Sequence, residues 1–179
     1  MERKAPNAGV FWTTVGGIVV VDVATKAWAE RALVPQRIPH EVAGDVVRLT
    51  LVYNPGAAFG LYLGEYSRWI FLVLTVLALV ILWRLYRTTR PTDRTRTMAL
   101  ALVCAGAVGN LIDRVRSPLG VVDFIDVGWG EMRWPTFNVA DMAVSAGAFL
   151  LAWVLWGEER TADGVRARAP IQPGPGEAS

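Results

Sequence analysis

Cysteine and histidine are almost absent from this chain. Its 179 residues include one cysteine, Cys104, and one histidine, His40. A single cysteine excludes an intramolecular disulfide, and one cysteine with one histidine cannot complete a zinc site. The net charge is only +2 at pH 7, so no broad basic field attracts nucleic acid. Because Cys104 lies in an apolar run, we expect it to be a buried small hydrophobic residue.

Long apolar runs are what the chain has in abundance, since 53% of its residues are hydrophobic. Four runs approach the ~20 residues that a helix needs to cross the hydrocarbon core of a bilayer; they cover about 10–29, 69–85, 98–112 and 139–156. The third is short and rich in Ala and Gly, which favours close helix packing. The sequence therefore predicts an all-α membrane protein with four transmembrane helices.

Basic residues predict how these helices are oriented. They are concentrated before the first run, between the second and third runs, and after the fourth: Arg3, Lys4, Arg84, Arg87, Arg90, Arg94, Arg96, Arg160, Arg166 and Arg168. By the positive-inside rule, both termini and the second connection are cytoplasmic. The first run is not a cleaved signal peptide, because Asp22 and Lys26 interrupt it. We expect one domain over residues 1–168 and a disordered, Pro- and Gly-rich cytoplasmic tail over 169–179.

The two outer loops contain strand-like segments. Residues 45–53 and 120–127 are rich in β-branched residues, and 128–130 has the composition of a turn. We expect these segments to form a small extracytoplasmic β-sheet that rests on the membrane surface.

Ionisable residues inside membrane segments cost ~2.5–3.5 kcal/mol each, so they are candidates for function. Asp22 and Lys26 share one helix face, as an internal ion pair or as a substrate contact. Asn54 opens the string NPGAAFG, where Pro55 and Gly56 also suit an ordinary turn.

Two further polar groups flank the second outer loop. In GAVGNLIDR, Gly106 and Gly109 suit close packing, Asn110 and Asp113 share a face, and Arg114 could alternatively extend to the membrane interface. Asn138 is placed as an N-cap, and Asp141 then falls in the first helical turn, where an acid is favoured. Asp123, on an apolar strand, has a weaker structural explanation.

The predicted topology places all these polar residues in the outer half of the protein. A site at the outer interface requires this grouping, whereas a proton or ion pathway would distribute its charges across the bilayer. The residues alone leave three possibilities open. These are an interfacial enzyme, a transporter or proton relay that uses Asp22, Asp113 and Asp141, and a noncatalytic membrane scaffold.

The order Asp22…Lys26, NPGAAFG, GAVGNLIDR, VVDF and FNVAD resembles the lipoprotein signal peptidase family, also called signal peptidase II. The resemblance covers roughly residues 10–156 and rests mainly on VVDF followed by FNVAD, together with GNLIDR. Pro55 occupies a position that varies in the family, and Asp126 is an additional acid outside its motifs.

The resemblance implies an aspartic endopeptidase at the outer face of a bacterial inner membrane. It would cut prolipoproteins just before their diacylglyceryl-modified cysteine, without a metal or organic cofactor. The implied partners are these prolipoproteins and membrane lipids, with no nucleic acid and a monomeric enzyme. Asp123 and Asp141 align with the catalytic aspartates. The positions that shape the site or hold substrate are Asp22, Lys26, Asn54, Gly106, Asn110, Asp113, Arg114, Asn138 and Ala140.

Two carboxylates facing one water would share a proton at neutral pH. We expect Asp141 to be the ionised partner, because a helix N-terminus favours an anion.

Overall fold

The computed structural model describes residues 7–56 and 63–167, which form four helices and four strands. In chain order these are α1 (Ala8–Ala32), β1 (His40–Ala43), β2 (Val47–Asn54), α2 (Ser67–Thr88), α3 (Arg94–Arg116), β3 (Val121–Trp129), β4 (Met132–Arg133) and α4 (Val139–Ala167). Each helix is long and apolar enough to cross a membrane, which confirms the predicted fold class. The predicted tail at 169–179 and residues 57–60 of the NPGAAFG string lie outside the described residues.

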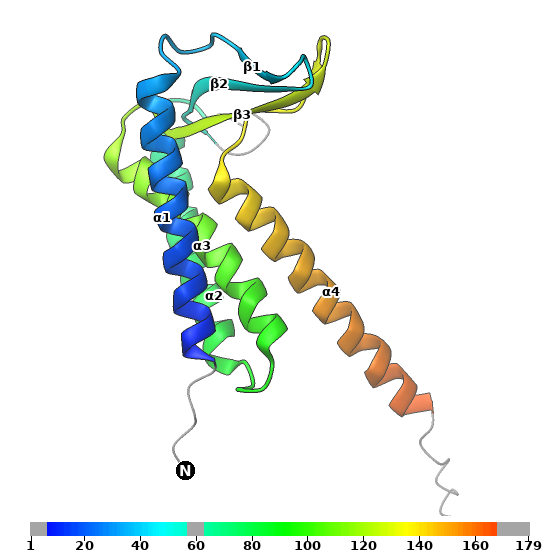
Figure 1. Ribbon diagram of the computed structural model, residues 1–179. Helices are drawn as coiled ribbons and strands as arrows, with labels where there is room; N and C mark the ends of the chain where they lie inside the picture. The colour runs from blue at the N-terminus through cyan, green and yellow to red at the C-terminus, as the bar shows by residue number, and fades with distance from the viewer. Residues whose placement is uncertain (1–6, 57–62, 168–179) are drawn as a thin grey trace, which may run out of the picture.

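The helices run between two different ends of the molecule (Figure 1). The sheet covers one end. The N-terminal end of α1, the α2–α3 connection and the C-terminal end of α4 lie at the other. The segments predicted to share one side of the membrane therefore lie at the same end of the molecule.

Helix α3 is the centre of the bundle and packs against α1, α2 and α4. Its small side chains make this possible, and Ala99, Ala101 and Ala105 are fully buried. A Cβ atom at Gly106 would collide with the carbonyl oxygen of Ala140 and lie 2.6 Å from Cγ2 of Val144. The predicted close packing of the third helix is therefore confirmed, and it brings α4 against α3 near the sheet.

Two apolar clusters hold the elements together. One lies among the helices and contains Phe11, Tyr86, Leu100, Ala101 and Cys104, so the lone cysteine is buried as predicted. The other joins the end of α1 to the sheet and contains Ala29, Leu33, Leu51, Val122 and Phe124. This second cluster fixes β2 and β3 over the helix ends that carry the polar residues.

The sheet is antiparallel, with the strand order β1-β2-β3-β4. The predicted strands at 45–53 and 120–127 correspond to β2 and β3, whereas β1 and β4 were not expected. The predicted turn at 128–130 begins later, at Gly130 and Glu131, because β3 continues through Trp129 and pairs Gly128 with Arg133 and Trp129 with Met132. A Cβ atom at Gly128 would lie 2.7 Å from Cα of Arg133, so glycine here permits close pairing rather than a turn.

Candidate active site

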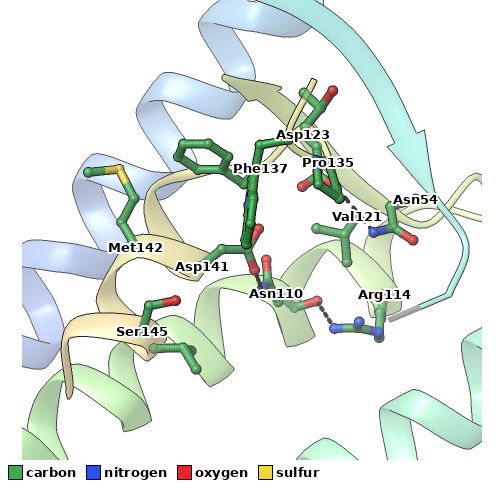
Figure 2. A pocket seen from close by; sticks show the side chains of 13 residues that line it. Asn54, Asn110, Arg114, Val121, Asp123, Pro135, Phe137, Asp141, Met142 and Ser145 are labelled. Carbon is green, nitrogen blue, oxygen red and sulfur yellow. Dashed lines mark hydrogen bonds between the residues drawn. The ribbon is translucent and has the colours of Figure 1, made fainter. Parts of the chain in front are cut away.

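A cavity of about 390 Å³ opens where β2, β3, α3 and α4 meet. Its polar lining comes from Asn54, Asn110, Arg114, Asp123 and Asp141 (Figure 2). Its other lining residues are Val121, Trp134, Pro135, Thr136, Phe137, Met142, Val144 and Ser145. Five of the eleven predicted site residues therefore face one space, although they come from four separate elements.

Asp123 lies within β3 and is only 3% exposed. Its Oδ1 accepts a hydrogen bond from Nδ2 of Asn138 at 2.7 Å, and its Oδ2 accepts one from Nδ2 of Asn54 at 3.2 Å. Burial raises the pKa of Asp123 to about 7, and the negative charge of Asp141 adds to this effect. The two amide hydrogen bonds act in the opposite direction. Asp123 is thus a carboxyl that can hold a proton near neutral pH.

Asp141 lies in the first turn of α4 and shares a reciprocal cap with Asn138. The Asp141 backbone N–H donates to Oδ1 of Asn138 at 2.9 Å, and the Asn138 backbone N–H donates to Oδ2 of Asp141 at 3.2 Å. This arrangement is a capping box, and it confirms the predicted N-cap. Since the Asn138 side chain also binds Asp123, one fully buried amide connects both aspartates.

Behind the pocket, Lys26 is the centre of a buried ionic cluster. Its Nζ lies 2.8 Å from Oδ2 of Asp22, 2.9 Å from Oδ2 of Asp113 and 3.0 Å from Oδ1 of Asn110. Lys26 is 1% exposed and Asp22 is 0% exposed, so the predicted internal ion pair is confirmed. Oδ1 of Asp22 also accepts the backbone N–H of Ala140 at 2.9 Å, which ties α1 to the start of α4.

Asn110 connects this cluster to the pocket. Its Oδ1 accepts from Lys26, and its Nδ2 donates to Oδ1 of Asp141 at 2.8 Å. An ammonium group can only donate, so Lys26 fixes which end of the Asn110 amide faces Asp141. The buried cation thereby ensures that Asp141 receives an N–H donor.

Arg114 supplies the positive charge on the pocket wall. It is only 9% exposed, so the alternative that Arg114 extends outward to the membrane interface is wrong. Its guanidinium donates to the carbonyl oxygens of Gly56 at 3.1 Å and Asn110 at 3.3 Å. Arg114 therefore fixes Gly56, two residues beyond the end of β2, to helix α3.

The remaining predicted residues support the pocket from behind. Asp22, Lys26, Asp113 and Asn138 are buried, and Asp113 accepts the backbone N–H of Val122 at 3.2 Å. Gly106 and Ala140 lie at the contact between α3 and α4, and a Cβ atom at Gly109 would lie 2.5 Å from Oδ2 of Asp22. Among the residues that the structure describes, no three His, Cys, Asp or Glu side chains converge as metal ligands.

Sequence reasoning missed the largely apolar side of the pocket. Residues 134–137 line it, together with Met142, Val144 and Ser145 of α4. The only signal for 134–137 was its position directly before Asn138, because the residue types themselves indicate no function.

Known proteins resemble this chain along most of its length. Residues 14–157 match the family described as Signal peptidase (SPase) II. A lipoprotein signal peptidase of Geobacter metallireducens is 40% identical over 87% of this chain and 95% of its own. One of Desulforapulum autotrophicum is 45% identical over 76% of this chain and 85% of its own. A bacterial membrane enzyme structure determined in meso at 2.3 Å resolution is 25% identical, with a TM-score of 0.79 over 96% of this chain and 100% of that one. This chain therefore belongs to the signal peptidase II family.

Proposed function

We propose that this chain removes signal peptides from diacylglyceryl-modified prolipoproteins, with Asp123 and Asp141 as its catalytic pair. Family membership makes the chain a membrane protease of the aspartic type. The observation that supports the catalytic pair most strongly is the position of Asn138, whose side-chain amide donates to the Asp123 carboxylate and whose backbone N–H donates to the Asp141 carboxylate. The cleaved bond is the one just before the lipidated cysteine.

The two aspartates share one proton in this proposal. Asp123 holds it, because burial raises its pKa to about 7. Asp141 is then the ionised partner, and it accepts hydrogen bonds from Asn110 and from the Asn138 backbone. The position of Asp141 in the first turn of α4 also favours an anion, because the positive end of the helix dipole lies there. The proton belongs to the pair as a whole, so its titration reports both groups.

The chemistry follows from these protonation states. Asp141 takes a proton from a water molecule, whose oxygen attacks the carbonyl carbon of the scissile bond. Asp123 donates its proton to the carbonyl oxygen as the tetrahedral intermediate forms. When the carbon–nitrogen bond breaks, Asp141 gives its proton to the departing amine of the lipidated cysteine, and Asp123 recovers a proton from the intermediate. The Arg114 guanidinium lines the same pocket as both aspartates, and its positive charge limits the negative charge that accumulates there.

The same proposal places the sheet at the outer face of a bacterial inner membrane. The opposite end of the bundle carries the exposed residues Arg84, Arg87, Arg90 and Arg94, which the positive-inside rule assigns to the cytoplasm. A pocket between helices near the outer interface lets the acyl chains of the substrate stay in lipid while its peptide bond meets water. Because Asp22, Asp113 and Asp141 are grouped near the sheet, this arrangement favours a peptidase over a proton relay.

Purified protein in detergent and a diacylglyceryl-modified prolipoprotein provide the test. Asp123→Asn and Asp141→Asn should each abolish cleavage just before the lipidated cysteine. Asp93→Asn is the matched control, because Asp93 caps α3 at the opposite end of the bundle and asparagine can still accept the Arg96 N–H. An inactive wild type, where another signal peptidase II cleaves, would refute the function. Cleavage that survives in either site variant would refute the catalytic pair.

A further inference from the structure

One wall of the pocket is a short segment, residues 134–137, between β4 and α4. Both of its ends are hydrogen-bonded to β3. The Trp134 N–H donates to the carbonyl of Val127 at 2.8 Å, and the Phe137 N–H donates to the carbonyl of Ile125 at 3.0 Å. The position of this wall therefore depends on how its two ends are attached to β3.

Arg133 directly precedes the wall and makes an unusually complete set of contacts. Its Nε and Nη2 both lie 2.9 Å from Oδ1 of Asp126, and Nη2 also donates to the Asp126 carbonyl at 3.2 Å. Its Nη1 donates to the carbonyl of Asp45 at 2.5 Å, so the same guanidinium reaches the connection before β2. Oδ2 of Asp126 accepts the Thr50 hydroxyl at 3.1 Å.

This ion pair is largely shielded from solvent. The side chains of Arg133 and Asp126 are 19% and 12% exposed, in contrast to the Arg96–Glu158 pair at 27% and 52%. Ion pairs that are shielded from solvent and joined by several hydrogen bonds contribute more to stability than isolated surface ion pairs do. Asp126 lies outside the proposed catalytic pair. Its pairing with Arg133 fixes β4 to β3, and β4 leads directly into the wall.

The catalytic pair is held by different contacts. Asp123 is bound by Asn54 and Asn138, and Asp141 by Asn110 and Asn138. None of these bonds involves the Arg133 side chain. Loosening the start of the wall should therefore displace the apolar surface that faces the substrate while the two carboxyl groups keep their positions.

We infer that Asp126 and Arg133 are positioning residues for substrate binding: their ion pair sets the apolar wall against which the peptide next to the scissile bond packs. This inference rests on the proposed function. The ligand chemistry is that of a short apolar peptide segment, since Trp134 and Phe137 offer ring surfaces and Pro135 lacks an N–H donor.

Steady-state cleavage of a diacylglyceryl-modified prolipoprotein by Asp126→Asn tests the inference. Asparagine keeps the size of the side chain and can still accept the Thr50 hydroxyl. It removes the nearer of the two carboxylates that pair with Arg133, at 2.9 Å, and leaves Asp45 at 3.9 Å. We expect KM to rise about five- to tenfold, the effect of losing roughly one shielded ion pair. We expect kcat to stay within about twofold, because a change in KM alone marks lost binding rather than lost chemistry. Glu158→Gln, which breaks the Arg96 pair at the far end, should change neither constant.

The outcomes are distinguishable. Wild-type protein that fails to cleave would overturn the proposed function. Active wild type with an unchanged KM in Asp126→Asn would overturn only the inference, as would a fall in kcat at constant KM. If Asp126→Asn does not fold, Arg133→Lys keeps the positive charge but loses the fork geometry. It must then show a raised KM with kcat preserved, and any other result overturns the inference.

Discussion

Replacement of Lys26 by methionine should strongly destabilise the protein. Methionine has a similar length and fills the space, so the main loss is the ammonium group with its three partners at 2.8, 2.9 and 3.0 Å. Asp22 would then be a buried carboxylate without its cation, and Asp113 would keep Arg116, whose Nη2 lies 3.6 Å from Oδ1 of Asp113. Removal of one partner from a buried ion pair costs about 3–5 kcal/mol. We expect a loss of that size in the free energy of unfolding, measured by SDS-driven unfolding in mixed micelles with tryptophan fluorescence.

Two further variants make this measurement decisive. Combining Lys26→Met with Asp22→Asn removes the negative charge that has lost its cation, so it should recover about 1–3 kcal/mol through the coupling of neighbouring sites. Arg96→Gln breaks an ion pair whose members are 27% and 52% exposed, and it should cost about 0–1 kcal/mol. A Lys26→Met variant no less stable than Arg96→Gln would show that the cluster contributes little to stability, and the reasoning would fail.

Three more predictions concern the pocket and its support. Because the pKa of Asp123 is raised to about 7, its proton is present below that pH and lost above it. The pH profile of kcat/KM should therefore fall on the alkaline side of about 7, and a flat profile from pH 6 to 9 would contradict this assignment. Asn138→Ala removes a hydrogen bond that lowers the pKa of Asp123, so the alkaline limb of the same profile should move to higher pH; an unmoved limb would argue against the contact. Gly109→Ala would place a methyl group 2.5 Å from Oδ2 of Asp22 and should cost about 1–3 kcal/mol of unfolding free energy. Gly17→Ala, in open space, should not lower it, and equal losses in the two alanine variants would refute the packing argument.

Local patterns were sufficient to predict the helices and the two main strands. Hydropathy and length marked the four helices, and β-branched runs marked β2 and β3. The capping pattern identified Asn138 and Asp141 as a pair at a helix start, which the structure confirms. Grouping the polar residues needed only the predicted topology, because helices that alternate in direction bring their outer ends together.

Long-range contacts could not be predicted in the same way. The spacing of Asp22 and Lys26 revealed one ion pair, but the third member, Asp113, comes from another helix. Strand β4 has only two residues and exists through its pairing with β3, so it carries no pattern of its own. The wall at 134–137 was missed for a related reason. Its residues become a pocket surface only when the Arg133 contacts and the start of α4 fix their position.

The hydrogen bond from the Ala140 N–H to Oδ1 of Asp22 joins the first helix of the chain to the start of the last. It has a consequence for how the protein is made. Asp141 enters the membrane with the final helix, and the turn that carries it is completed by a side chain synthesised more than a hundred residues earlier. With Asp141 in the proposed catalytic pair, a chain that has not yet inserted α4 lacks one of the two carboxyl groups. On that proposal, hydrolytic activity begins only after α4 has packed against α1, and copies without α4 in place do not cut neighbouring chains during biogenesis.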